Sequence, residues 1–315
     1  MLDVISVTGP IYITIAIGYL ATRFGLFESS DMRSLGRYVL YLALPMLLFR
    51  ALSRKSVTEI ANPAYIAVYL LATLAMVLIG YFVVRKLFGR ERMTAAVSAM
   101  GMSCPNSGFV GYPIILLTFP SIAGNVLALN MLVENVFVIP LLLALAERAR
   151  GQEGHPLQAL AGALGRLALN PLVIGLAAGI VFSLTGLQLP APVAKSVDLF
   201  AQSSAALSLF VIGGMLVGLP LTGLAGRIVP IVAGKLLVHP ALVLAVLVAM
   251  PMLGFAPVET PFREALVLSA AMPLFGIYPI LAQKYGEEGF AAVALLATTV
   301  VSFVTVSGLL WYVTS

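Results

Sequence analysis

Charged side chains are scarce in this sequence: they make up 10% of its 315 residues, whereas a soluble globular chain has about 25%. Hydrophobic residues make up 61% of the chain. This balance excludes an ordinary soluble domain and predicts an all-α polytopic membrane protein. The alternation of apolar and polar residues that is typical of a transmembrane β-barrel is also missing, and the apolar runs are too long for barrel strands.

Cysteine and histidine are almost absent. The single cysteine, Cys104, excludes an intrachain disulfide and any cysteine-built metal site. The two histidines, His155 and His239, fall in a predicted loop and a predicted membrane span, so we expect no shared metal site and no cofactor. A basic segment ahead of the first apolar run is also missing, since Asp3 is the only charged residue before that run. We therefore expect an uncleaved first helix and not a signal peptide.

Sequence motifs of enzymes and ATP-driven pumps are absent too. The chain has no nucleotide-binding P-loop, no His-Glu-x-x-His motif, no Gly-x-Ser-x-Gly elbow and no paired intramembrane aspartates. A repeated charged ring or filter-like sequence, as in a channel, is not found either. The net charge of +5 does not indicate nucleic acid, because Lys and Arg lie between apolar segments. These absences favour a secondary transporter, which is not an enzyme.

What the sequence does have is two long apolar stretches that proline and glycine interrupt near their centres. Residues 93–118 contain Pro105, and residues 265–283 contain Pro273. Proline removes a backbone donor and leaves a carbonyl group without its helical partner. Lipid cannot satisfy such groups, so interrupted backbone belongs against protein or a water-filled cavity. Two interrupted segments at corresponding positions of two halves predict a transporter binding site.

We expect ten membrane-spanning helices, which charges and turn residues separate. They are roughly Val4–Thr22, Ser34–Leu52, Pro63–Val84, Met93–Thr118, Gly124–Ala146, Leu167–Leu184, Leu199–Val217, Ile228–Ala249, Pro261–Ala282 and Gly289–Val313. An amphipathic lead-in to the sixth span is expected around Leu157–Leu164. Lys and Arg are more frequent in the loops on one side, which predicts that both termini lie outside.

The charged connector Glu147–Pro156 divides the chain into two sets of five spans. Because five is odd, the second set must run inverted relative to the first. We therefore predict one five-helix repeat in residues 1–150 and an inverted five-helix repeat in residues 157–315. Ser98-Ala99-Met100, Pro105 and Tyr112-Pro113 in the first half have counterparts in Ser269 to Pro273 and Tyr278-Pro279 in the second.

Three motifs resemble the auxin efflux carrier family, which includes the plant PIN proteins and bacterial relatives labelled malonate transporters. They are Pro105-Asn106-Ser107-Gly108-Phe109, Gly111-Tyr112-Pro113 and Asn170-Pro171-Leu172-Val173-Ile174-Gly175. The run from Leu187 to Pro192 and Gly213-Gly214-Met215 also fit. The resemblance covers essentially the whole chain, and its most specific parts are the fourth span and the sixth-to-seventh segment.

This resemblance implies a fold and a mechanism. Helices four and nine are broken at prolines and cross, a scaffold of helices 1, 2, 6 and 7 holds a mobile core of helices 3–5 and 8–10, and the protein is an elevator-type homodimer in the plasma membrane, here the bacterial inner membrane. The crossing prolines map onto Pro105 and Pro273, and the family's asparagine maps onto Asn106. Leu274 stands where a symmetric asparagine would be.

The resemblance and the broken helices together predict a substrate site for a small organic anion, such as a carboxylate or an auxin-like acid. We expect Pro105, Asn106, Ser107, Pro273 and Leu274 to form it, through freed backbone groups and the Asn106 amide. The alternative to a substrate site is a pair of ordinary proline kinks, against which neighbouring helices pack. Gln202 and Ser203 in the seventh span either line the scaffold side of the substrate path or serve tight helix packing.

Two charged residues lie within predicted spans. Glu134 lies near the middle of the fifth span, where an ionisable group is costly. It either couples proton movement to transport or is a structural acid. Lys235 in the eighth span either pairs with Glu134, replaces a coupling cation, attracts the substrate or extends to the membrane interface. A sodium-coupled carrier of the bile-acid type is the alternative transporter, although residues 265–283 around the second break contain no acid. A membrane-embedded hydrolase is a more distant alternative.

Overall fold

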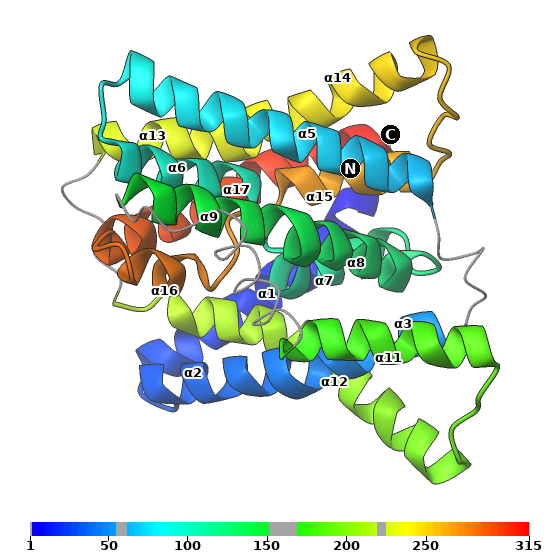
Figure 1. Cartoon of the computed structure of the whole chain (residues 1–315). Helices are drawn as coiled ribbons and strands as arrows, with labels where there is room; N and C mark the ends of the chain where they lie inside the picture. The colour runs from blue at the N-terminus through cyan, green and yellow to red at the C-terminus, as the bar shows by residue number, and fades with distance from the viewer. Residues whose placement is uncertain (1, 55–61, 151–168, 219–224, 315) are drawn as a thin grey trace. The chain divides into compact units, whose positions relative to one another are not determined.

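Every regular element in the described part of the computed structural model is helical (Figure 1). The structure describes residues 2–54, 62–150, 169–218 and 225–314. The predicted lead-in Leu157–Leu164 and most of the connector Glu147–Pro156 lie outside these residues. Six helical stretches among the described residues are long and apolar enough to cross a membrane: Ser30–Ser53, Pro63–Leu87, Ala123–Ala149, Ala191–Met215, Gly226–Met252 and Glu288–Val313.

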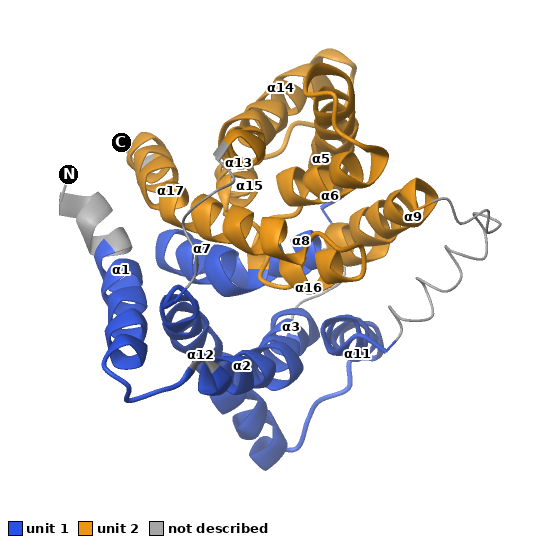
Figure 2. Ribbon diagram, turned by 90° about the vertical axis from the view of Figure 1, so that its left-hand side faces the viewer, with its two compact units in different colours: residues 1–63, 108–131, 168–218 blue, residues 64–107, 132–167, 219–315 orange. Residues whose placement is uncertain are grey.

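The chain separates into two compact units, and each unit takes segments from both halves of the sequence (Figure 2). Unit 1 comprises residues 1–63, 108–131 and 168–218. Its helices are α1 (Leu2–Arg23), α2 (Ser29–Tyr38), α3 (Leu44–Ser53), α7 (Tyr112–Thr118), α8 (Ala123–Leu132), α11 (Pro171–Thr185) and α12 (Ala191–Met215), with the π-helical η1 (Val39–Ala43) joining α2 to α3. The π-helical η3 (Ser107–Gly111) links the two units along the chain.

Close helix contacts hold unit 1 together, and glycine allows them. A methyl group at Gly213 of α12 would overlap the carbonyl oxygen of Ile15 in α1. A methyl group at Gly175 of α11 would likewise overlap the carbonyl oxygen of Pro45 in α3. Without a driving force from water, membrane helices associate through such close packing of small residues.

Unit 2 comprises residues 64–107, 132–167 and 219–315. Its helices are α5 (Pro63–Phe82), α6 (Arg92–Ser103), α9 (Ile139–Ala149), α13 (Ala225–Ala233), α14 (His239–Met252), α15 (Phe262–Ala271), α16 (Tyr278–Gln283) and α17 (Glu288–Thr314). Three π-helical segments continue or join them: η2 (Val83–Leu87), η4 (Val133–Val138) and η5 (Gly234–Val238). Within this unit α6 packs against α9, and α15 packs against α14 and α17.

Helix boundaries differ from the expected spans by more than four residues at two places. The helix expected from Ser34 begins at Ser29, because Glu28 and Asp31 form a reciprocal capping box. The helix expected from Leu199 begins at Ala191, with Pro192 in its first turn. In that second case the expectation treated Lys195 and Asp198 as loop residues, but a long helix carries them within its first three turns.

Candidate functional site

The two expected helix breaks occur at the residues before Pro105 and Pro273. Helix α6 ends at Ser103, and Cys104 is extended with φ −99° and ψ 109°. Helix α15 ends at Ala271, and Met272 is extended with φ −62° and ψ 150°. The proline ring clashes with a helical conformation of the residue before it, so both helices end where the sequence requires.

The two breaks meet inside unit 2. Pro105 and Leu274 form an isolated antiparallel bridge. The backbone N–H of Asn106 donates to the carbonyl oxygen of Pro273 at 2.8 Å. The backbone N–H of Phe275 donates to the carbonyl oxygen of Cys104 at 3.4 Å. Each interrupted segment thus satisfies backbone groups of the other, which the apolar surroundings could not do.

Side chains around this crossing are buried. Asn106 and Ser107 are buried, and Leu274 is fully enclosed. The Tyr278 hydroxyl donates to the carbonyl oxygen of Val97 at 2.9 Å and so ties α16 to α6. The structure therefore brings Pro105, Asn106, Ser107, Pro273 and Leu274 together.

Glu134 lies next to the crossing and accepts two short hydrogen bonds. The hydroxyl of Ser107 donates to its Oε1 at 2.6 Å, and the hydroxyl of Tyr69 on α5 donates to the same oxygen at 2.7 Å. Glu134 is 5% exposed. It belongs to η4, where the π-helical turn widens the helix; such turns often occur at functional sites.

Lys235 is fully buried, so the expectation that its side chain could extend to the membrane interface is wrong. Its Nζ contacts Nδ1 of His239 at 2.9 Å and donates to the carbonyl oxygen of Ala270 at 2.6 Å. Nε2 of the same histidine lies 3.2 Å from Oγ1 of Thr73 on α5. Neighbouring side chains and backbone thus hold the amine inside the unit.

Lys235 and Glu134 do not form a close ion pair, because neither belongs to a salt bridge within 4.0 Å among the described residues. They do interact electrostatically at longer range. The Tyr69 ring stacks on the His239 ring with 6.4 Å between the centroids. The acid and the base therefore sit in neighbouring hydrogen-bonded clusters that Tyr69 and His239 bring into contact.

Sequence reasoning missed Tyr69 and Thr73, and for His239 it gave only a position within a predicted span. Tyr69 and Thr73 stand one helical turn apart in an unbroken apolar run, and residues four apart share one face of a helix. That spacing was the available signal. It does not show which side chains they would meet, because Glu134 and His239 come from distant parts of the chain.

Gln202 and Ser203 lie on α12 in unit 1. Gln202 is exposed, while Ser203 is half-buried. Ser203 Oγ lies 3.0 Å from the hydroxyl of Tyr38 and donates to the carbonyl oxygen of Phe200 at 2.7 Å. The contacts of Ser203 thus include the packing of α12 against α2.

A family model described as "Membrane transport protein" matches residues 4–312. The chain belongs to this membrane transport family. The match confirms the resemblance to auxin efflux carriers and their bacterial relatives, and with it the conclusion that this protein is a transporter and not an enzyme.

Two bacterial relatives in this family cover nearly the whole transporter. A Rhizobium meliloti protein named "Putative malonate transporter" is 29% identical over 321 residues, which cover 100% of this chain and 97% of that protein. An Escherichia coli K12 protein named "Uncharacterized transporter YfdV" is 26% identical over 308 residues, which cover 96% of this chain and 95% of that protein. The similarity thus extends through both interrupted segments.

Proposed function

We propose that this transporter is a secondary carrier for a small organic anion, a carboxylate or an auxin-like acid. The observation that carries the proposal is the paired backbone at Pro105 and Leu274, with the Glu134 carboxylate bound to Ser107 beside it. Interrupted helices that meet deep in a membrane unit are typical of transporter binding sites. The name of the Rhizobium meliloti relative supports a dicarboxylate such as malonate as the first substrate to test.

In this proposal Asn106 and the backbone around Pro105 and Pro273 contact the substrate, and Leu274 forms an apolar wall. Lys235 contributes a buried positive charge that favours an anion in the same unit. Gln202 and Ser203 line the scaffold side of the path. Glu134 exchanges a proton during the transport cycle and so couples proton movement to uptake.

We further propose an elevator mechanism, in which unit 2 moves as the transport core and unit 1 is the scaffold. Its support is the composition of the units: unit 1 holds α1, α2, α3, α11 and α12, which correspond to the scaffold helices 1, 2, 6 and 7. Residues 108–131 of the fourth and fifth spans also belong to unit 1. The remaining elements of this proposal are ten spans in two inverted repeats, both termini outside the plasma membrane, and a homodimer.

The direct test is uptake of radiolabelled malonate and indole-acetate into proteoliposomes that contain the purified protein. We expect saturable uptake of at least one acid that an inward proton gradient accelerates and that sodium leaves unchanged. Asn106→Ala should reduce uptake by about tenfold or more, as the loss of one hydrogen bond to a charged group implies. Sodium-dependent uptake would favour the bile-acid-type alternative instead.

Asn170→Ala is the matched control for Asn106→Ala. Asn170 caps α11 by accepting a hydrogen bond from the amide of Leu172 at 2.9 Å. Its loss should lower stability by about 1 kcal/mol and leave uptake per folded molecule unchanged. Equal loss of uptake in both variants would contradict a substrate site at Asn106.

A further inference from the structure

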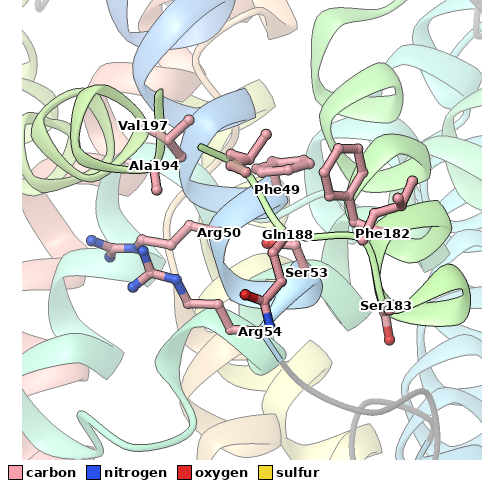
Figure 3. Close-up of a pocket in the computed structure, with 12 residues that line it drawn as sticks. Phe49, Arg50, Ser53, Arg54, Phe182, Ser183, Gln188, Ala194 and Val197 are labelled. Atoms are coloured by element: carbon pink, nitrogen blue, oxygen red, sulfur yellow. The ribbon is translucent and has the colours of Figure 1, made fainter. Parts of the chain in front are cut away.

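A cavity of about 500 Å³ lies in unit 1 where three helices end (Figure 3). Its walls come from the carboxyl end of α3, the end of α11 with the loop after it, and the first turns of α12. The volume falls within the range of small-molecule sites, about 300–1,000 Å³. No step of the proposed transport mechanism uses this cavity.

One wall of the cavity carries a surplus of positive charge. Arg54 Nη2 donates to both carboxylate oxygens of Asp198, at 2.8 Å each. Arg50, one turn earlier on α3, has its Nη1 3.8 Å from Asp198 Oδ1, which is too far for a hydrogen bond. Figure 3 shows the two guanidinium groups next to each other. One carboxylate therefore faces two guanidinium groups, which leaves a net charge of about +1.

Arg50 keeps donors for a ligand. A guanidinium group has five N–H donors, and the contacts of Arg50 with Asp198 and with the hydroxyl of Tyr112 cannot use all of them. Its side chain is 23% exposed, and that of Arg54 is 55% exposed. A phosphate or carboxylate group that enters the cavity can therefore reach both side chains.

The opposite wall is apolar. The rings of Phe49 and Phe182 meet edge to face with centroids 5.0 Å apart. Leu187 and Leu189 also line the cavity. Figure 3 shows the Phe182 ring on the side of the cavity away from the guanidinium groups. Ser53 and Gln188 also line the cavity and supply neutral polar groups. The site thus suits a ligand with an anionic head and an apolar tail.

The position along the helices favours a lipid as this ligand. In the helical stretch Ser30–Ser53, Arg50 is the first charged residue after the apolar run Tyr38–Phe49. The cavity therefore lies where the apolar part of the span gives way to the headgroup region. An arginine at the end of a span can place its guanidinium group at the headgroup region, where it can donate charge-assisted hydrogen bonds to a lipid phosphate group.

We propose that this cavity binds one anionic phospholipid, such as phosphatidylglycerol. Its phosphodiester accepts hydrogen bonds from Arg50 and Arg54, its glycerol hydroxyls face Gln188 and Ser53, and the start of one acyl chain lies along Phe49 and Phe182. The bound lipid joins α3, α11 and α12 at one end of unit 1. Its anionic charge balances the guanidinium group that Asp198 leaves uncompensated.

The test uses the full-length protein, purified and delipidated in a neutral detergent. Native mass spectrometry should retain one phosphatidylglycerol per chain, and phosphatidylglycerol should raise the unfolding temperature more than phosphatidylcholine at the same mole fraction. Arg50→Gln leaves the Arg54–Asp198 pair in place and removes the surplus charge. It should weaken phosphatidylglycerol binding roughly fivefold. Arg50→Lys should restore part of the affinity.

Lys195→Gln is the matched control, because Lys195 is an exposed cation on the first turns of the same α12 but does not line the cavity. It should bind phosphatidylglycerol as the unchanged protein does. Equal binding of both lipids, or equal loss in Lys195→Gln and Arg50→Gln, would overturn the proposal. Stabilisation by soluble glycerol phosphate or malonate to the same extent as by phosphatidylglycerol would show a site for a free anion and also overturn it.

Discussion

The hydroxyl of Tyr69 and the carboxylate of Glu134 form a 2.7 Å hydrogen bond between a residue of α5 and a residue of η4, both of which are buried. Ser107, directly after the Pro105-Asn106 break, donates to the same oxygen at 2.6 Å. This acid is therefore linked to the interrupted backbone through one residue. A change in the protonation of Glu134 and a change in the conformation of the crossing backbone should therefore affect each other.

Glu134→Gln should abolish the pH dependence of uptake. Glutamine keeps the shape and can still accept from Tyr69 and Ser107, but it cannot exchange a proton. Titratable groups face Glu134 from three elements, namely Tyr69 on α5, Cys104 after α6 and Lys235 in η5. The effect is measured as the initial uptake rate of malonate between about pH 5 and 8. This is the pH range in which proteins are usually most stable.

Glu147→Gln is the control for this variant. Glu147 lies on the same helical stretch, near its end, and contacts Lys284 and Tyr285. Its replacement should leave the pH profile of uptake unchanged. If Glu134→Gln has the pH profile of the unchanged protein, Glu134 is a structural acid and does not couple proton movement to uptake.

Tyr69→Phe should lower the stability of the protein by about 1.5–3 kcal/mol, since it removes a hydrogen bond to a buried carboxylate. The thermal unfolding midpoint of the purified protein in detergent reports this loss. Tyr41→Phe provides the comparison, because Tyr41 is 62% exposed and its hydroxyl has no such buried partner. Equal midpoints for the two variants would mean that the bond from Tyr69 to Glu134 contributes no net stability.

Lys235→Met should reduce uptake by about tenfold or more, the effect of roughly 1.4 kcal/mol lost from the binding of an anion. Methionine keeps most of the side-chain length but removes the amine, its contact with His239 Nδ1 and its hydrogen bond to the carbonyl oxygen of Ala270. Uptake is compared at equal amounts of folded protein, judged by size-exclusion chromatography.

Lys284→Met is the control for Lys235→Met, because the Lys284 side chain is 52% exposed. The Lys284→Met variant should retain uptake. Full uptake by folded Lys235→Met would assign Lys235 a packing role only.

Gly213→Ala should destabilise the protein by about 1–3 kcal/mol through overpacking. The added methyl group would overlap the backbone of Ile15 at the contact of α1 with α12. Gly308→Ala tests the same substitution in α17, where nothing lies within 4 Å of the added atom. It should be neutral or stabilising, because alanine favours a helix by roughly 0.5–1 kcal/mol over glycine. An unchanged unfolding midpoint in Gly213→Ala would contradict the close contact.

Several parts of the fold could be predicted from the sequence because their causes are local. Apolar runs between charges predict helices, and the residue before a proline leaves the helix wherever that proline occurs. The breaks at Cys104-Pro105 and Met272-Pro273 follow in this way. The start of α12 at Ala191 was missed, because a run of charges and prolines at a membrane interface resembles a loop although it can be the first turns of a helix.

The sequence by itself determined that this protein is a helical membrane protein with two helices interrupted at Pro105 and Pro273, since composition and proline stereochemistry act on the chain wherever it folds. Only the tertiary structure decided that the two interruptions pair through Asn106 and Pro273, that Tyr69 binds Glu134, and that Lys235 turns inward to His239. Those contacts join residues distant in the chain, and the direction of a buried polar side chain depends on which partners the packed helices place within hydrogen-bond distance.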